Sequence, residues 1–167
     1  LQSALDWREP TGWALVSAMT LALATIPLWW SIRRLFGTPT AWASTILFCL
    51  LPMHWREAIA TGYYPLAYLC LFTGFALFLL LIERNRVAAL CLLGIFFGLT
   101  LATSHAFFTL LPWFVIVYIW ERRKDWKHGL VELAACGLSA YIAFILPLLP
   151  NALRPGMSTT ERLGAFL

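Results

Sequence analysis

The chain has 167 residues, of which 61% are hydrophobic and only 12% are charged, and its net charge is +4. A soluble domain has about half apolar and about a quarter charged residues, so this composition is not that of an ordinary soluble protein. The basic residues flank apolar runs and are explained by membrane topology, so they give no argument for nucleic acid as a partner.

Five runs of the sequence contain no Asp, Glu, Lys or Arg: residues 10–32, 35–53, 58–82, 87–120 and 133–153. A helix that crosses the hydrocarbon core needs about 20 apolar residues, and its backbone groups must be satisfied within the segment. The runs therefore predict transmembrane helices. We expect an all-α, polytopic transmembrane helical bundle of about six spans, at residues 12–32, 38–53, 64–82, 87–103, 106–120 and 130–150.

Between the second and third spans lies the polar and aromatic stretch LPMHWREAIATGYYPLAYL, residues 51–69. On a helix, His54, Glu57, Thr61 and Tyr64 fall on the same face, because the last three follow His54 by three, seven and ten residues. We expect a short helix over residues 54–63 at the membrane interface.

Two interpretations of this stretch remain open. The first is an interfacial belt, in which tryptophan and tyrosine lie at headgroup depth and Arg56 pairs with Glu57 or extends to the headgroups. The second is the wall of a binding site, in which His54 and Glu57 face a polar ligand and Arg56 binds a phosphate.

The run 87–120 is too long for one span. Its 34 residues would form a helix of about 51 Å, against a hydrocarbon core of about 30 Å. Because Ser104 and His105 interrupt the run, we expect two short helices joined there as a hairpin; the alternative is one long tilted helix with a polar kink. His105 is either a site residue, since an ionisable group in a membrane segment is costly, or a neutral imidazole that stabilises the turn.

Six spans place most basic residues on one side of the membrane. Eight of the 12 lie in alternate loops: Arg33, Arg34, Arg84, Arg86, Arg122, Arg123, Lys124 and Lys127. The positive-inside rule therefore predicts that residues 33–37, 83–86 and 121–128 are cytoplasmic, in a plasma, inner or ER membrane. The stretch 51–69 and His105 then share the extracytoplasmic face. Both ends of the chain look cut, so we expect residues 1–167, with all six spans, to form one transmembrane part of a larger protein.

Small residues recur at four-residue spacing in two predicted spans. Gly94 and Gly98 form a GxxxG motif, and Ala135, Ser139 and Ala143 form a second row. Such rows let helices pack closely in lipid, so we interpret them as packing surfaces. The four cysteines are scattered singly, without the spacing of metal ligands, and no metal site is predicted.

The order of these segments resembles the middle of a GT-C superfamily membrane glycosyltransferase, and most of all the membrane protein O-mannosyltransferase-like family. The resemblance covers most of the chain from about residue 12. Its matching positions are Trp55, Ala58, Tyr64, Gly98-Leu99, His105, Leu111-Pro112, Gly137-Leu138-Ser139, Tyr141 and Leu146-Pro147.

This resemblance implies transfer of a sugar from a polyprenyl-phosphate-linked donor to a protein or glycan acceptor on the extracytoplasmic face, in contact with membrane lipid. The family's key acidic residue lies in a loop that would precede this chain, so we assign no catalytic residue here. The substrate-binding candidates are His54, Arg56, Glu57, Tyr64, His105 and Arg154. One position departs from the family, since Gly62 stands where related sequences carry a glutamate. The cofactor stays undefined, and a requirement for a divalent metal is left open.

Two alternatives belong to other functional classes. A transporter or flippase segment would place a polar site at mid-membrane, often at a broken helix. Only Glu132 is charged and expected well inside a span, and it lies near the cytoplasmic end. The break at Ser104–His105 would suit transport if 87–120 were one interrupted span. A non-catalytic membrane scaffold is the second alternative.

Overall fold

The computed structural model describes residues 10–52, 56 and 64–149, and this part of the chain is an all-α helical bundle. Its elements are α1 (Pro10–Phe36), α2 (Thr38–Leu50), α4 (Tyr64–Leu81), α5 (Arg86–Thr103), the short 3-10 helix η2 (His105–Thr109), α6 (Leu110–Glu121) and α7 (Trp126–Ile145). Four of these helices, α1, α4, α5 and α7, are long and apolar enough to cross a membrane. The predicted fold class is confirmed.

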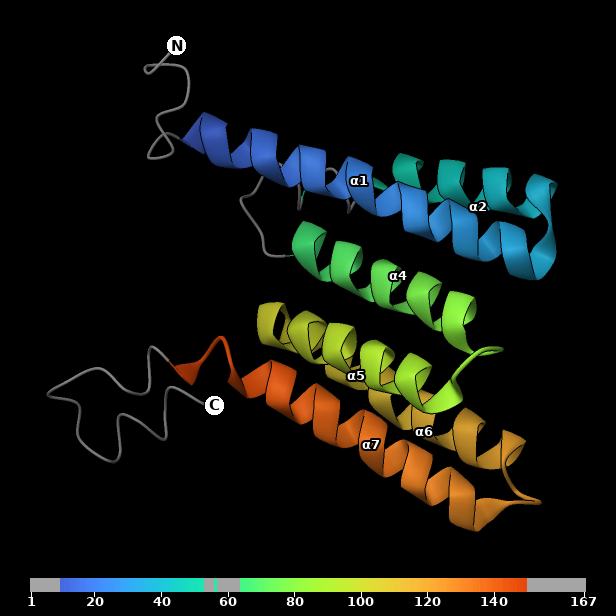
Figure 1. The fold of residues 1–167 in the computed structure, drawn as a ribbon. Helices are drawn as coiled ribbons and strands as arrows, with labels where there is room; N and C mark the ends of the chain where they lie inside the picture. The colour runs from blue at the N-terminus through green and yellow to red at the C-terminus, as the bar shows by residue number, and fades with distance from the viewer. Residues whose placement is uncertain (1–9, 53–55, 57–63, 150–167) are drawn as a thin grey trace, which may run out of the picture.

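Consecutive helices run in opposite directions, as Figure 1 shows. The turns α1–α2, α4–α5 and α6–α7 therefore lie at one end of the bundle, which we call the basic end because the predicted cytoplasmic loops form it. The first turn of α4 and the α5–η2 junction lie at the opposite end. Close packing follows the order α2, α1, α4, α5, α7, and α6 lies beside α7 on one face of this layer.

The hairpin predicted within residues 87–120 is present. Helix α5 ends at Thr103, Ser104 is extended with φ −153° and ψ 115°, and the chain returns through η2 into α6. The alternative of one long tilted helix is therefore wrong. Helix α6 has only 12 residues, which is about 18 Å, and η2 adds about 10 Å. Together they come close to the thickness of the hydrocarbon core.

Helix α1 continues four residues beyond the predicted end at 32. The guanidinium groups of Arg33 and Arg34 lie 5.1 and 5.6 Å from the rings of Trp29 and Trp30, one turn earlier on the helix. These cation–π contacts let the two arginines stay helical at the membrane edge. The helix ends at Gly37, whose φ of +89° is a conformation that favours glycine, and α2 begins directly after it.

The GxxxG motif of α5 packs against α7 at Cys136, Ser139 and Ala140, of which Ser139 belongs to the second predicted row. A Cβ atom added to Gly94 would collide with the carbonyl oxygen of Cys136 and the hydroxyl of Ser139. One added to Gly98 would collide with the carbonyl oxygen of Ala140. The predicted role of the GxxxG motif in packing is confirmed, and its partner is α7.

Candidate functional site

An aromatic cluster joins three elements at the end opposite the basic turns. Tyr68 of α4 stacks on Phe72 at 5.9 Å and meets the edge of Phe48 of α2 at 5.4 Å. Phe107 of η2 meets Tyr68 in an edge contact at 5.6 Å. Edge and offset contacts of this kind stabilise the packing of aromatic rings. We call Phe48, Tyr68, Phe72 and Phe107 the aromatic cluster, and it holds η2 against α4.

The same region of α4 and α5 is joined by a buried threonine. The Thr100 hydroxyl donates to the carbonyl oxygen of Phe96 in its own helix at 2.8 Å and lies 3.4 Å from the carbonyl oxygen of Ala67. Thr100 is fully buried, so its hydroxyl finds its acceptors on the protein, because lipid offers none. The beginning of α4 is therefore fixed against the end of α5.

This packing brings two of the predicted site positions into one region. Tyr64 is the first residue of α4, one turn before Tyr68, and is half-buried. His105 is the first residue of η2, two positions before Phe107, and its side chain lies outside the described part of the structure. The sequence left open whether the turn at 104–105 meets the stretch 54–64. The contact of Phe107 with Tyr68 joins η2 to α4, and most of the stretch 54–63 lies outside the described residues.

The other predicted site residues are placed less fully. Arg56 is exposed. His54, Glu57 and Arg154 lie outside the described residues, as does most of the interfacial helix expected over 54–63. Their assignment to a binding site stays a prediction.

At the basic end, a buried carboxylate is held by three partners, one from α5, one from α6 and one from the residue that directly follows α6. Glu132 of α7 is only 9% exposed. Arg122 donates to both of its oxygens, from Nη2 at 2.7 Å and from Nε at 3.1 Å. Tyr118 of α6 donates to Oε2, and Nε of Arg86 of α5 lies 3.5 Å from Oε2. We call these four residues the Glu132 cluster.

The Glu132 cluster ties α5, α6 and α7 together where they leave the membrane. Hydrogen bonds to Tyr118 and Glu132 raise the pKa of Arg122 above its ordinary value, so its guanidinium stays charged. The sequence singled out Glu132 but not its partners. A signal for the cluster was present in the sequence. Tyr118 and Arg122 are one helical turn apart at the end of an apolar run, and Glu132 follows them after a short turn.

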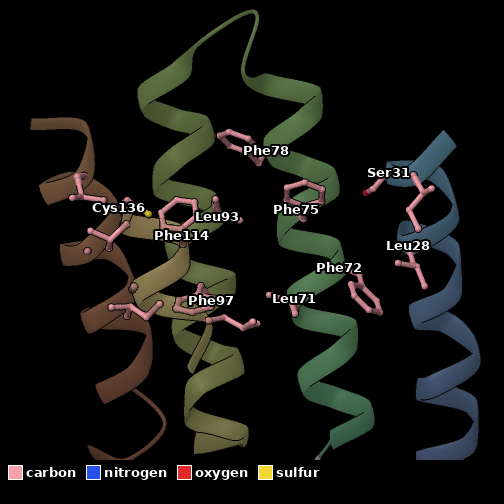
Figure 2. Close-up of a pocket in the computed structure, with 17 residues that line it drawn as sticks. Leu28, Ser31, Leu71, Phe72, Phe75, Phe78, Leu93, Phe97, Phe114 and Cys136 are labelled. Atoms are coloured by element: carbon pink, nitrogen blue, oxygen red, sulfur yellow. The ribbon is translucent and has the colours of Figure 1, made fainter. Parts of the chain in front are cut away.

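Below this cluster lies an apolar cavity of about 500 Å³, which Figure 2 shows between α1, α4, α5, α6 and α7. Its walls are leucine, phenylalanine and other apolar side chains, and the hydroxyl of Ser31 and the thiol of Cys136 are the polar side-chain groups among them. A cavity of this size is in the range of small-molecule sites. Its lining suits hydrocarbon and not a sugar or another polar substrate.

Among the described residues, no three histidine, cysteine or acidic side chains gather as a metal site would require. Comparisons with models of protein families, with curated proteins and with solved structures find no match to this chain.

Proposed function

We propose that this chain is part of an integral-membrane glycosyltransferase that moves a sugar from a polyprenyl-phosphate-linked donor to an acceptor on the extracytoplasmic face. The observation that carries the proposal is the aromatic cluster. It joins α4, which begins at Tyr64, to η2, which begins at His105, at the end opposite the basic turns. These are two of the positions through which the sequence resembles the GT-C family.

The distribution of charge supports the orientation. All three basic turns lie at one end of the bundle, and the positive-inside rule assigns that end to the cytoplasm. The Tyr64 and His105 segments then face the compartment in which lipid-linked sugars would be used. Arg56 and Arg154 are the proposed phosphate-binding residues, and His54, Glu57, Tyr64 and His105 would contact the sugar or acceptor.

The structure gives less support to a transporter. The break at Ser104 separates two antiparallel helices and does not interrupt a single span. No charged side chain lies in the middle turns of the six described α-helices. A mid-membrane ion or substrate site of the kind that transporters use therefore lacks its usual ligands in this part of the chain.

The activity is tested by transfer of radiolabelled sugar from a polyprenyl-phosphate donor to acceptor by the full-length protein in vesicles. We expect the variants Glu57→Ala and His105→Ala to lose at least about tenfold in rate, since each removes a hydrogen bond to a polar substrate in a largely apolar setting. Matched controls are Glu83→Ala and His128→Ala, which change exposed residues of the same types at the basic end. Full activity of both site variants would exclude these two residues from the site.

Orientation is tested by thiol labelling. In a cysteine-free background, a membrane-impermeant maleimide applied from outside should label His105→Cys and leave Arg84→Cys, in the α4–α5 turn, unlabelled until the membrane is opened. The reverse pattern would invert the topology. Protection of His105→Cys from both sides would place it within the membrane and favour the transporter.

A further inference from the structure

The cavity of Figure 2 contains one buried hydroxyl without a partner. Ser31 is 3% exposed, and its Oγ has no hydrogen-bond partner among the described residues. A serine in a helix often donates to the carbonyl four residues earlier, and Ser31 does not. Figure 2 shows its oxygen on the side of α1 that faces the cavity and Phe75. A buried donor left unpaired is costly, so its position indicates an acceptor inside the cavity.

Water does not meet this need. A buried water molecule requires two to four polar partners. Apart from the Ser31 hydroxyl, the only polar side-chain group among the described residues of the cavity wall is the weak thiol of Cys136. Apolar cavities stay dry and take up apolar ligands. The occupant must therefore be mainly hydrocarbon and carry one hydrogen-bond acceptor at the level of Ser31.

The depth of Ser31 identifies the kind of acceptor. It lies five residues before the end of α1 at Phe36, which is about 7.5 Å along the helix axis from the basic end. This places the acceptor just inside the membrane, below the level of the phosphates. The ester carbonyl of a glycerophospholipid lies at this depth, whereas a polyprenyl phosphate carries only hydrocarbon beneath its phosphate.

The charge of the basic end identifies the headgroup. Residues 33–37, 83–86 and 121–132 contain eight basic and four acidic residues. Such an excess at the membrane edge attracts anionic lipids. The two guanidinium groups of the Glu132 cluster, on Arg86 and Arg122, are 28% and 24% exposed and lie beyond the cavity at this end.

We propose that the cavity holds one acyl chain of an anionic glycerophospholipid from the leaflet at the basic end, and that Ser31 donates a hydrogen bond to the ester carbonyl of that chain. The lipid chain would fill the space between α1 and the α5–α6–α7 group, alongside α4, which packs against both α1 and α5. This inference is independent of the proposed glycosyl transfer, because it concerns the opposite leaflet and needs only the membrane fold.

The test is native mass spectrometry of the full-length protein, delipidated in detergent and titrated with four lipids. These are ester-linked phosphatidylglycerol, its diether analogue, phosphatidylcholine and a polyprenyl phosphate. We expect the ester-linked phosphatidylglycerol to bind about fivefold more tightly than the diether, because the diether lacks the carbonyl that one hydrogen bond requires. It should also bind more tightly than phosphatidylcholine, which has no net charge. The polyprenyl phosphate tests the proposed donor site at the opposite leaflet, and its binding should not depend on the cavity.

Two variants separate the contribution of the Ser31 hydrogen bond to lipid affinity from that of the space for the acyl chain. Ser31→Ala should bind the ester and the diether lipids with equal affinity. That affinity should match the affinity of the unchanged protein for the diether. Gly137→Leu should lose at least about tenfold in affinity, because Gly137 lines the cavity and a Cβ atom there meets nothing within 4 Å, so the leucine occupies the space of the chain. Gly137→Ala, which adds one methyl group, is the matched control and should retain the lipid.

The proposal is overturned if the unchanged protein binds ester and diether lipids equally, or if Gly137→Leu weakens binding of the polyprenyl phosphate as much as that of phosphatidylglycerol, because the cavity would then be the polyprenyl site. It is also overturned if the delipidated protein takes up no phosphatidylglycerol, which would mean that another segment of protein fills the cavity. Should Gly137→Leu fail to fold, the comparison of ester and diether on Ser31→Ala decides the question alone.

Discussion

Replacement of Glu132 by alanine is expected to lower the free energy of unfolding by about 3 kcal/mol, near the lower end of the range for breaking a buried ion pair. The loss arises because the carboxylate is 9% exposed and its removal leaves the guanidinium groups of Arg86 and Arg122 without their shared partner. The value lies at the lower end because both guanidinium groups keep some access to the headgroup region, where they can be solvated.

The measurement is SDS-induced unfolding of the detergent-solubilised protein, followed by circular dichroism. Glu83→Ala is the matched control, since Glu83 also pairs with an arginine, Arg34 at 3.1 Å, but is 77% exposed. An exposed pair of this kind contributes about 0–1 kcal/mol. If the two variants lose the same stability, the Glu132 cluster does not join α5, α6 and α7 as the geometry indicates.

The second large effect is expected at the contact of α5 with α7. Gly98→Ala places a Cβ atom against the carbonyl oxygen of Ala140, so the two helix backbones must separate. Overpacking against a rigid backbone lowers the free energy of unfolding by about 3 kcal/mol, and the higher helix propensity of alanine raises it by about 1 kcal/mol. We therefore expect a net loss of about 2 kcal/mol in the same unfolding measurement.

Gly137→Ala is the control for this substitution, because it makes the same change on the facing helix where a Cβ atom meets open space. It should leave stability unchanged or raise it by up to about 1 kcal/mol. A Gly98→Ala variant as stable as Gly137→Ala would show that the close approach of α5 and α7 is not required in the membrane.

The sequence by itself determined the six α-helices of residues 10–52 and 64–149, the hairpin at Ser104 and the clustering of the basic turns. These properties depend on local quantities, namely the length of each apolar run and the position of the charges between runs. It also predicted the GxxxG packing row, because small residues at four-residue spacing define a helix face whatever that face contacts. The helix ends were less well predicted, as at α1, where tryptophan–arginine stacking carries the helix to Phe36.

Only the tertiary structure decided which helix faces meet. The order α2, α1, α4, α5, α7 places Arg86 and Tyr118 beside Glu132, and Phe107 beside Tyr68, although these pairs are far apart in the sequence or separated by turns. The packing of the helices also creates the cavity that Ser31 lines. An apolar helix in lipid is hydrophobic on every side, so its sequence does not mark one face for burial, and its neighbours are selected by shape and by a few polar contacts. Those contacts appear only when the helices are packed.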